Sequence, residues 1–494
     1  MTRKSWKKHH KWFGILFCLF LLLFCISGIV LNHRSAVSSL DISRKYLPSD
    51  FHYQNWNNGL LRGTVQLETS NEADSILLYG NAGVFKANNS GEYFRDYNRG
   101  FEKGVDNRNI QGVVEVPNGT LFAASQFSLY KAVAGRWQKV DKAPVTRLTD
   151  LIVSGDSLIV VGRSELYVSV PPYGSFTSLQ LKAPEGYVQE VSLFRTIWLI
   201  HSGELFGIVG KILVDIIGII LIVISLTGVL YWLVPKYIKR LKHKKRSTDV
   251  SIKVLKGSLN WHDKLGKYTI LLTLFVTITG WCLRPPLLLA LVAMKVPPVP
   301  GSILSSNNPW HDKLRALRYD KQMKEWLLSS SEGFFSLQSL SDIPLKLENT
   351  PPVSVMGINV FRYESDTNDW LIGSFSGMYR WNRTSGAIFD YFTNEVPESM
   401  SSAPFGKRAI SGYSDDFLTS PLVVEYTKGT EVLPMPDSYC SLPISLWSIA
   451  LEVHTGRIFT ILGAGTLVYT TFAGLIVLWI LISGYLIRKS KRSP

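Results

Sequence analysis

A histidine stands at the polar start of two long apolar stretches, and the two stretches resemble each other. The segment "HKWFGILFCLFLLLFCISG" (10–28) aligns without a gap on "HDKLGKYTILLTLFVTITG" (262–280), so that His10 matches His262. Imidazole is the commonest side-chain metal ligand and also titrates near neutral pH. A single histidine at a membrane interface more often contacts a headgroup, water or a helix end, so the repetition is what makes these two candidate ligands.

A second pair of histidines repeats in the same way. The segment "HSGELFGIVG" (201–210) aligns on "HTGRIFTILG" (454–463), so that His201 matches His454. Self-similarity of this kind indicates a duplication, with one half at about 1–250 and the other at about 251–494. Each half contains an apolar span, a large polar segment and a second apolar span.

The elements that must position these histidines are membrane spans. The chain has 494 residues, of which 46% are hydrophobic, and the apolar residues gather in long runs. A membrane helix needs roughly 20 mostly apolar residues. Four runs meet this criterion, at about 13–32, 205–234, 266–294 and 458–487. The sequence therefore predicts an α-helical polytopic membrane protein with four transmembrane helices, built as a duplicated two-helix unit.

The basic residues predict the orientation of the spans. The net charge is +15, and sixteen of the 53 basic residues lie just before the first span, after the second and after the fourth. Basic segments next to membrane spans stay in the cytoplasm. Topology and contact with anionic lipid explain this charge better than nucleic-acid binding, which we do not expect. We expect a bacterial inner-membrane protein with cytoplasmic termini and two large periplasmic segments.

The expected domain organisation follows from the spans and the charge. We divide the chain into a cytoplasmic N-terminus (1–12), a first span (13–32), a first β-rich outer domain (33–200), an outer helix end with the second span (201–235), a basic cytoplasmic linker (236–262), a third span (263–295), a second β-rich outer domain (296–447), an outer helix end with the fourth span (448–487) and a cytoplasmic tail (488–494).

A ten-residue pattern recurs in the two outer segments. An apolar strand is followed by a turn and by an aromatic residue at the tenth place, in 76–85, 121–130, 158–167, 326–335 and 370–379. Neighbouring copies are separated by about 37–45 residues, which is the spacing of propeller blades. Ordinary antiparallel hairpins give the same pattern. We expect two β-rich domains, with a propeller, either in each or shared by both, as one form they can take.

The duplication has a geometric consequence for the histidines. The first and third spans run in the same direction, so the halves are parallel repeats about an axis along the membrane normal. This places His10 and His262 near the cytoplasmic face, and His201 and His454 near the outer face. Two imidazoles at one depth suit a six-coordinate haem, whose iron takes one ligand from each side. His33, at the outer end of the first span, is an alternative or additional ligand.

Two further features near the spans are candidates for a role. Lys211 and Asp215 are four residues apart in the second span, so we expect them to share a helix face and to pair. The stretch Arg284-Pro285-Pro286 is expected to end or kink the third span, because proline cannot continue a helix. Arg284 is also placed to meet a haem propionate.

The motifs around the histidines resemble one known family. The segments "HHKWFG…SGIVL", "WHDKLG…TGW", "IHSGELFG…LTGVLYW" and "HTGRIF…ISGYL" resemble the PepSY-associated transmembrane family. That family includes iron-regulated inner-membrane proteins and dihaem ferric-siderophore reductases. The resemblance implies two haem b groups, with ligands that fall by motif position on His10, His201, His262 and His454. It also implies electron flow from the cytoplasmic side to an iron complex outside.

The remaining sequence leaves the function open between two classes. No P-loop, G-x-S-x-G, H-E-x-x-H or Cys-x-x-Cys motif occurs, and no catalytic residue is assigned. A haem-dependent reductase of this form takes electrons from membrane quinol or from a soluble donor protein, and passes them to a ferric siderophore or a similar iron complex. The alternative is a non-enzymatic sensor or scaffold, in which the β-rich domains bind a ligand or protein partner and the spans serve as anchors.

Overall fold

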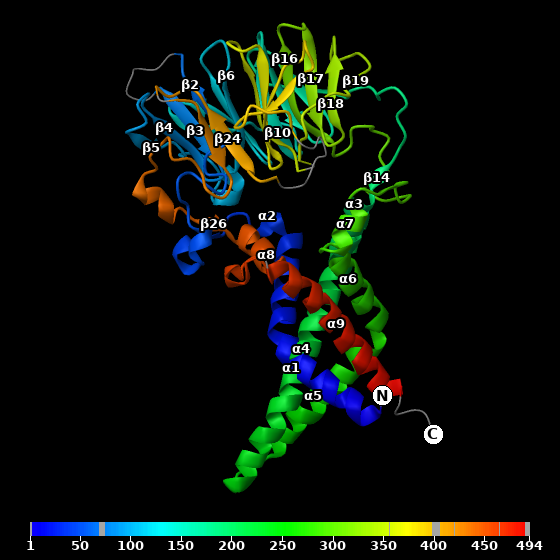
Figure 1. Cartoon of the computed structure of the whole chain (residues 1–494). Helices are drawn as coiled ribbons and strands as arrows, with labels where there is room; N and C mark the ends of the chain where they lie inside the picture. The colour runs from blue at the N-terminus through cyan, green and yellow to red at the C-terminus, as the bar shows by residue number, and fades with distance from the viewer. Residues whose placement is uncertain are drawn as a thin grey trace. The chain divides into compact units, whose positions relative to one another are not determined.

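The computed structural model describes residues 2–68, 75–354, 356–397, 406–418, 420–463 and 465–489. It contains two compact units (Figure 1). We call Met1–Val37, Gln189–Ser305 and Leu446–Pro494 the helical unit, and Ser38–Val188 and Ser306–Ser445 the β unit. Ala464, which aligns with Lys211 in the repeat, and residues 490–494 of the expected tail lie outside the described residues.

Three long helices of the helical unit match expected membrane spans. They are α1 (Arg3–Asn32), α4 (Gly207–His243) and α9 (Gly465–Lys489), and each is long and apolar enough to cross a membrane. Many of their large apolar side chains are exposed, as for Leu16 and Leu467. A helix that is apolar on its outer side fits a lipid environment rather than water.

The third expected span is not one straight helix. It is divided into α5 (Asp249–Tyr268) and α6 (Ile270–Cys282), whose axes differ by 70°, and it counts as a candidate span only if this bent pair is taken together. The expectation of an uninterrupted third span is therefore corrected. The bend lies at Thr269, whose hydroxyl donates to the carbonyl oxygen of Leu265 in the preceding turn. A threonine that bonds back in this way often bends a helix.

The proline-containing stretch ends the helix, as expected. Helix α6 stops at Cys282, and after Pro285-Pro286 only the short α7 (Leu287–Leu291) follows. Two other short helices lie near the spans, α3 (Leu193–Ser202) and α8 (Leu446–His454). The two-residue strands β14 (Val191–Ser192) and β15 (Lys295–Val296) pair next to them. Helix α3 ends at Gly203, in a left-handed conformation (φ 77°) that suits glycine.

Apart from a two-stranded sheet that joins residues 41–42 to 444–445, the described part of the β unit consists of short antiparallel sheets, each made of strands that are consecutive in the chain. The first segment forms three four-stranded sheets, which are β2–β5 (Gly63–Gln66, Ile76–Gly80, Gly83–Ala87, Phe94–Asp96), β6–β9 (Ile110–Glu115, Leu121–Ser125, Leu129–Val133, Arg136–Lys139) and β10–β13 (Leu148–Ser154, Ser157–Gly162, Leu166–Ser169, Thr177–Leu179).

The second segment continues the same arrangement. Its sheets are β16–β19 (Leu314–Asp320, Glu325–Ser330, Gly333–Leu337, Leu345–Lys346), β20–β23 (Ile358–Glu364, Asp369–Ser374, Gly377–Trp381, Ile388–Asp390) and the two-stranded β24–β25 (Ile410–Ser414, Leu422–Glu425). The recurring ten-residue pattern forms the second and third strands of every four-stranded sheet. The expectation that these two segments are β-rich is thus confirmed.

The two β-rich segments form one unit rather than two separate domains. The first strand of each sheet contacts the first strand of the next, in the order β2, β6, β10, β16, β20 and β24, and β24 contacts β2. One core cluster joins Trp56 to Leu433, and the indole of Trp56 donates to the carbonyl oxygen of Leu433 at 2.9 Å. The strands β1 (Asp41–Ile42) and β26 (Ile444–Ser445) also pair across the two segments. The expectation of two β domains is corrected, because β10 of the first segment contacts β16 of the second, and β24 of the second contacts β2 of the first.

Charged side chains connect neighbouring sheets near their first strands. Arg318 on β16 pairs with Asp150 on β10 at 2.5 Å. Arg62, just before β2, donates to the side chains of Asn81 and Asn109 at 2.7 and 2.6 Å. Burial lowers the pKa of Arg62 to about 10, which still leaves it charged at neutral pH. These contacts satisfy polar groups that burial between sheets would otherwise leave without partners.

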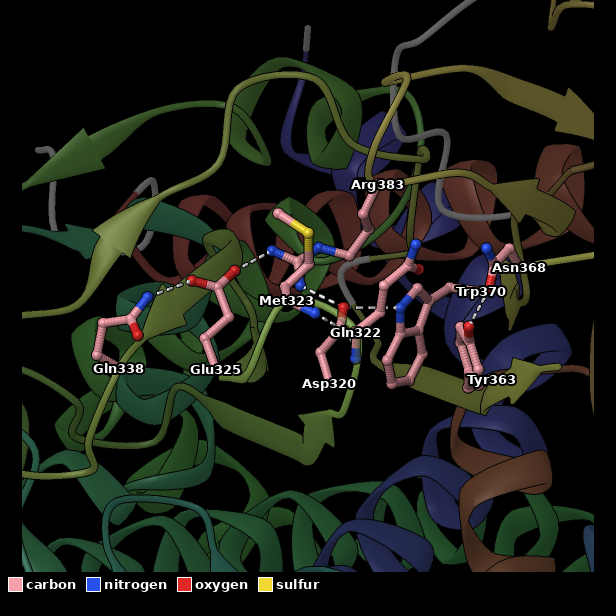
Figure 2. Close-up of polar contacts among 9 residues, drawn as sticks. All are labelled: Asp320, Gln322, Met323, Glu325, Gln338, Tyr363, Asn368, Trp370 and Arg383. Atoms are coloured by element: carbon pink, nitrogen blue, oxygen red, sulfur yellow. Dashed lines mark hydrogen bonds and ion pairs between the residues drawn. The ribbon is translucent and has the colours of Figure 1, made fainter.

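A buried polar network joins the β16–β19 and β20–β23 sheets (Figure 2). Asp320 at the end of β16 accepts hydrogen bonds from the indole of Trp370 at 3.1 Å and from Arg383 at 2.6 Å. Arg383 also pairs with Glu325 on β17. The side chains of Asp320 and Arg383 are only 2% and 6% exposed. The stability of this network therefore depends on both Asp320 and Arg383, because a buried charge without its partner is costly in free energy.

Candidate cofactor-binding site

The first pair of repeated histidines lies close together in the helical unit. His10 on α1 and His262 on α5 have ring centroids 6.0 Å apart, with the ring planes at 71° to each other. Both rings are partly buried, and the two histidines belong to different halves of the repeat. The structure thus brings together the two residues that the alignment matched.

The second pair has the same separation. His201 is near the end of α3 and His454 is the last residue of α8, and their ring centroids are also 6.0 Å apart, with planes at 44°. The two short helices that end at these rings are separate from the long spans. The structure again brings together residues that match in the repeat.

Each of the four rings is held by the same kind of contact. The Nδ1 atom lies 2.9–3.1 Å from a helix carbonyl oxygen and 3.1–3.3 Å from a serine or threonine hydroxyl three residues further along the same helix. The holding residues are Ile480 and Ser483 for His10, Val276 and Thr279 for His201, Ile224 and Thr227 for His262, and Phe24 and Ser27 for His454.

These contacts define which ring nitrogen carries the proton. A carbonyl oxygen only accepts hydrogen bonds, so Nδ1 must donate. The hydroxyls of Ser27 and Thr227 donate to carbonyl oxygens of their own helices at 2.6 and 2.7 Å, and therefore also accept from Nδ1. The Nε2 atom keeps its lone pair, and none of the four has a hydrogen-bond partner at Nε2 among the described residues. This is the state in which histidine binds a metal.

A glycine follows each holding hydroxyl and leaves room for the ring. A Cβ added to Gly28, Gly228, Gly280 or Gly484 would lie 3.1, 3.2, 2.7 or 3.0 Å from Cε1 of the histidine that the same helix holds. By contrast, a Cβ on Gly14 would meet nothing within 4 Å. The close approach of ring and backbone therefore requires glycine at the four histidine-facing positions.

The Ser-Gly and Thr-Gly pairs contact the four histidines, which the sequence analysis did not predict. They lie in the last part of each of the four motifs that resemble the family, at 27–28, 227–228, 279–280 and 483–484. Their recurrence in every span was a signal for a shared role. What the sequence does not show is which histidine each pair contacts, because the two are 35 to 473 residues apart in the chain.

The two halves of the chain hold each other's histidines. His10 and His201 of the first half are held by α9 and α6 of the second half. His262 and His454 of the second half are held by α4 and α1 of the first half. Each site therefore needs both halves for its ligands and also for the groups that orient them.

The arrangement fits a metal that takes two imidazoles from opposite sides. Two imidazole nitrogens about 2 Å from one metal place the ring centroids roughly 6 Å apart. A protein-bound zinc ion needs three or four ligands, and the described residues contain no group of three or more His, Cys, Asp and Glu side chains suited to a metal. A haem iron, whose other four ligands come from the porphyrin, needs only the two.

His33 makes a different set of contacts from the four repeated histidines. Its Nε2 lies 2.7 Å from Oδ2 of Asp215 and donates to this carboxylate, so that Nδ1 is the ring nitrogen that keeps its lone pair. His33 as an alternative or additional ligand stays a prediction. The expected pairing of Lys211 with Asp215 is wrong, because Lys211 pairs with Glu204 at 3.4 Å and Asp215 pairs with His33.

Arg284 lies beside the second histidine pair. Its Nη2 is 3.5 Å from the carbonyl oxygen of His454, and it stands two residues after Cys282, the last residue of α6. A guanidinium here adds positive charge next to the two rings. That Arg284 meets a haem propionate stays a prediction.

One family model matches nearly half of the chain. Residues 1–235, which include α1, the first β segment and most of α4, match the PepSY-associated TM region family. The resemblance noted in the sequence is confirmed, and the protein is a membrane protein. None of the curated proteins matches the chain.

Two solved structures match at low similarity. They are extracellular domains of proposed one component and hybrid two component systems of B. thetaiotaomicron, at 10% identity and TM-scores of 0.34 and 0.35. The matches cover 74% and 76% of this chain, and this chain spans 31% of the length of each of those chains.

Proposed function

We propose that this protein is a b-type dihaem electron conduit of a bacterial inner membrane. One haem would be held by His10 and His262, and the other by His201 and His454. The observation that carries the proposal is the fourfold repetition of one holding arrangement, in which every Nδ1 is bonded and every Nε2 is left available. A histidine that only packs against its neighbours does not need this difference between a bonded Nδ1 and an unbonded Nε2.

The spacing of the two pairs supports a relay across the membrane. His10 and Phe24, which accepts from His454, are both on α1 and are 14 residues apart. A rise of 1.5 Å per residue separates the two levels by about 21 Å along the helix. One centre near each face divides the roughly 30 Å apolar layer into shorter steps.

The chain's own residues would prepare each site for haem. Helix carbonyls and hydroxyls orient the four imidazoles and make them better ligands, as such outer partners do at other metal sites. Glycines let each ring lie against a helix, and Arg284 adds a positive group beside the second site. Haem, when bound, supplies reversible one-electron chemistry.

In the proposed orientation the chain crosses the membrane four times, and the bent α5–α6 pair is the third span. Both termini lie on the cytoplasmic side. The basic residues at the start of α1 and at the end of α4 support this orientation. The β unit would then be periplasmic, and its six sheets, whose first strands contact one another in a closed order, would form a six-bladed propeller. We propose that it receives the acceptor, a ferric siderophore or a similar iron complex.

The first experiment is a pigment measurement on the full-length protein. Protein purified after expression with ample haem should show a reduced-minus-oxidised b-type spectrum and bind two haems per chain. His454→Ala should remove about half of the haem, and His311→Ala in the β unit is the matched control. A colourless protein, or four single His→Ala variants that keep all haem, would overturn the proposal and favour the sensor or scaffold alternative.

A further inference from the structure

We propose that His33 and Asp215 form the proton-accepting part of a binding site for a quinol from the lipid phase. The site would supply the electron donor of the proposed conduit, and in this respect it rests on the proposed function. No other pair in the membrane helices has this combination of a buried carboxylate and an accessible histidine among the described residues.

The geometry of the pair is that of an oriented base. Oδ2 of Asp215 accepts from Nε2 of His33 at 2.7 Å, and Oδ1 accepts from the amide of Asn32 at 3.0 Å. Because Nε2 carries the hydrogen, Nδ1 of His33 holds the lone pair, and it has no hydrogen-bond partner among the described residues. A carboxylate that holds an imidazole in this way orients it and stabilises its charged form after it accepts a proton.

The pair also lies where a lipid-soluble molecule can reach it. The side chain of His33 is 42% exposed, whereas that of Asp215 is 12% exposed, so a ligand meets the histidine. His33 directly follows α1, a candidate span. On α4, Ile212 and Ile219 lie three residues before and four after Asp215, on the same side of the helix, and both are about half exposed. They offer an apolar surface for an isoprenoid tail.

The same hydrogen bonds connect the pair to the second proposed haem site. The amide of Asn32 donates to Asp215 and also to the carbonyl oxygen of Ser202 at 3.1 Å. Ser202 is the next residue after His201, one of the proposed ligands. A quinol bound at His33 would thus lie near the redox group that takes its electrons.

The proposed reaction balances as follows. A quinol ring has two O–H bonds, and its oxidation to the quinone breaks both, with release of two protons and two electrons. The first proton passes to Nδ1 of His33, whose imidazolium is stabilised by Asp215, and leaves to water before the second proton follows the same way. A haem held by His201 and His454 would supply the one-electron oxidant for each of the two electrons.

The pair has no counterpart in the repeat. His33 aligns with Pro285, and Asp215 aligns with Val468. Duplication alone therefore does not account for these residues, in contrast to the four ligands. A function that is needed on one side of the membrane and in one half of the protein explains such an asymmetry.

The test measures binding of decylubiquinone to the full-length protein in lipid nanodiscs, together with the haem spectrum of the same samples. His33→Gln and Asp215→Asn should each weaken binding about tenfold or more, because each removes a hydrogen bond in which a charged group takes part. They should also slow haem reduction by decylubiquinol about a hundredfold or more, while leaving reduction by dithionite unchanged. Lys211→Gln, which removes an ion pair from the same helix, is the matched control and should change neither quantity.

The outcomes separate this inference from the proposed function. Decylubiquinone binding that is absent, or equally tight in His33→Gln and Asp215→Asn, would overturn the quinol site even if two haems are present. Haem-free protein that binds decylubiquinone through this pair would support the site and overturn the electron conduit. If His33→Gln loses haem, Asp215→Asn and Asn32→Ala decide, and unchanged binding in both would overturn the quinol site.

Discussion

Nδ1 of His454 donates to the carbonyl oxygen of Phe24, 3.0 Å away in space and 430 residues away in the chain. The same relationship connects the other three repeated histidines to helices of the opposite half. Because Nδ1 is bonded in every case, Nε2 is the atom that each ring presents to a ligand. The following predictions test this arrangement.

The first prediction concerns the glycine that faces His201. In Gly280→Ala the new Cβ would lie 2.7 Å from Cε1 of His201, so the ring must move away from its holding groups. We expect the haem content to fall to about half, measured by the pyridine haemochrome spectrum. Gly14→Ala, with nothing within 4 Å, is the control and should keep all haem while stabilising α1 by about 0.5–1 kcal/mol. Full haem content in Gly280→Ala would contradict the close approach.

The second prediction concerns the hydroxyl that holds His262. Thr227→Val keeps the shape of the side chain and removes the acceptor that lies 3.3 Å from Nδ1. Loss of such an outer partner typically lowers metal affinity about 10–100-fold, so we expect weaker haem retention in a transfer assay with apomyoglobin. Thr277→Val is the matched control, because the hydroxyl of Thr277 bonds only to its own helix at Thr273. Equal haem loss from both variants would show that the hydroxyl of Thr227 has no special role.

The third prediction tests which histidines share a haem. His10→Ala and His262→Ala should each remove the same haem, so the double variant should retain as much haem as either single variant. His10→Ala combined with His454→Ala should remove all haem, because these residues belong to different pairs. Additivity of this kind separates independent sites from shared ones. A double variant of His10 and His262 without any haem would refute the pairing at 6.0 Å.

The fourth prediction concerns the β unit. Asp320→Ala removes the acceptor of Trp370 and leaves Arg383 buried with only one of its two carboxylate partners. We expect a loss of about 3–5 kcal/mol in the free energy of unfolding of the β unit, measured by tryptophan fluorescence in denaturant on the full-length protein. Lys139→Ala, which removes a half-exposed pair with Glu102, should cost less than about 1 kcal/mol. Equal midpoints for the two variants would contradict the role of the network.

Local patterns in the sequence predicted much of the fold. Hydropathy located the three long helices, and the ten-residue pattern located the second and third strands of each four-stranded sheet. The bend at Thr269 was not predicted, because a short polar interruption is weak against a long apolar run. The sequence left open whether both β segments join in one unit, since the contact between Trp56 and Leu433 connects distant residues of ordinary apolar type.

For the candidate site, too, local patterns predicted some contacts and missed those between distant parts of the chain. Internal repetition predicted which histidines lie side by side, because equivalent residues of a parallel repeat share a depth. It did not predict that Phe24 and Ser27 hold His454, since neither hydropathy nor spacing within a motif identifies a partner on another helix. The partner of Asp215 was predicted to be Lys211 on the same helix, whereas the nearer group in space is His33. Spacing along one helix does not reveal a neighbouring helix.

The reciprocal holding of the histidines bears on the origin of the chain. A single half has neither a complete pair of imidazoles nor the carbonyls that steady them, so an ancestor of half the length would have worked only as a homodimer. Fusion of the two genes made the subunits unequal partners that evolve separately. The joined copies can differ at equivalent positions, as at Asp215 in the first half and Val468 in the second.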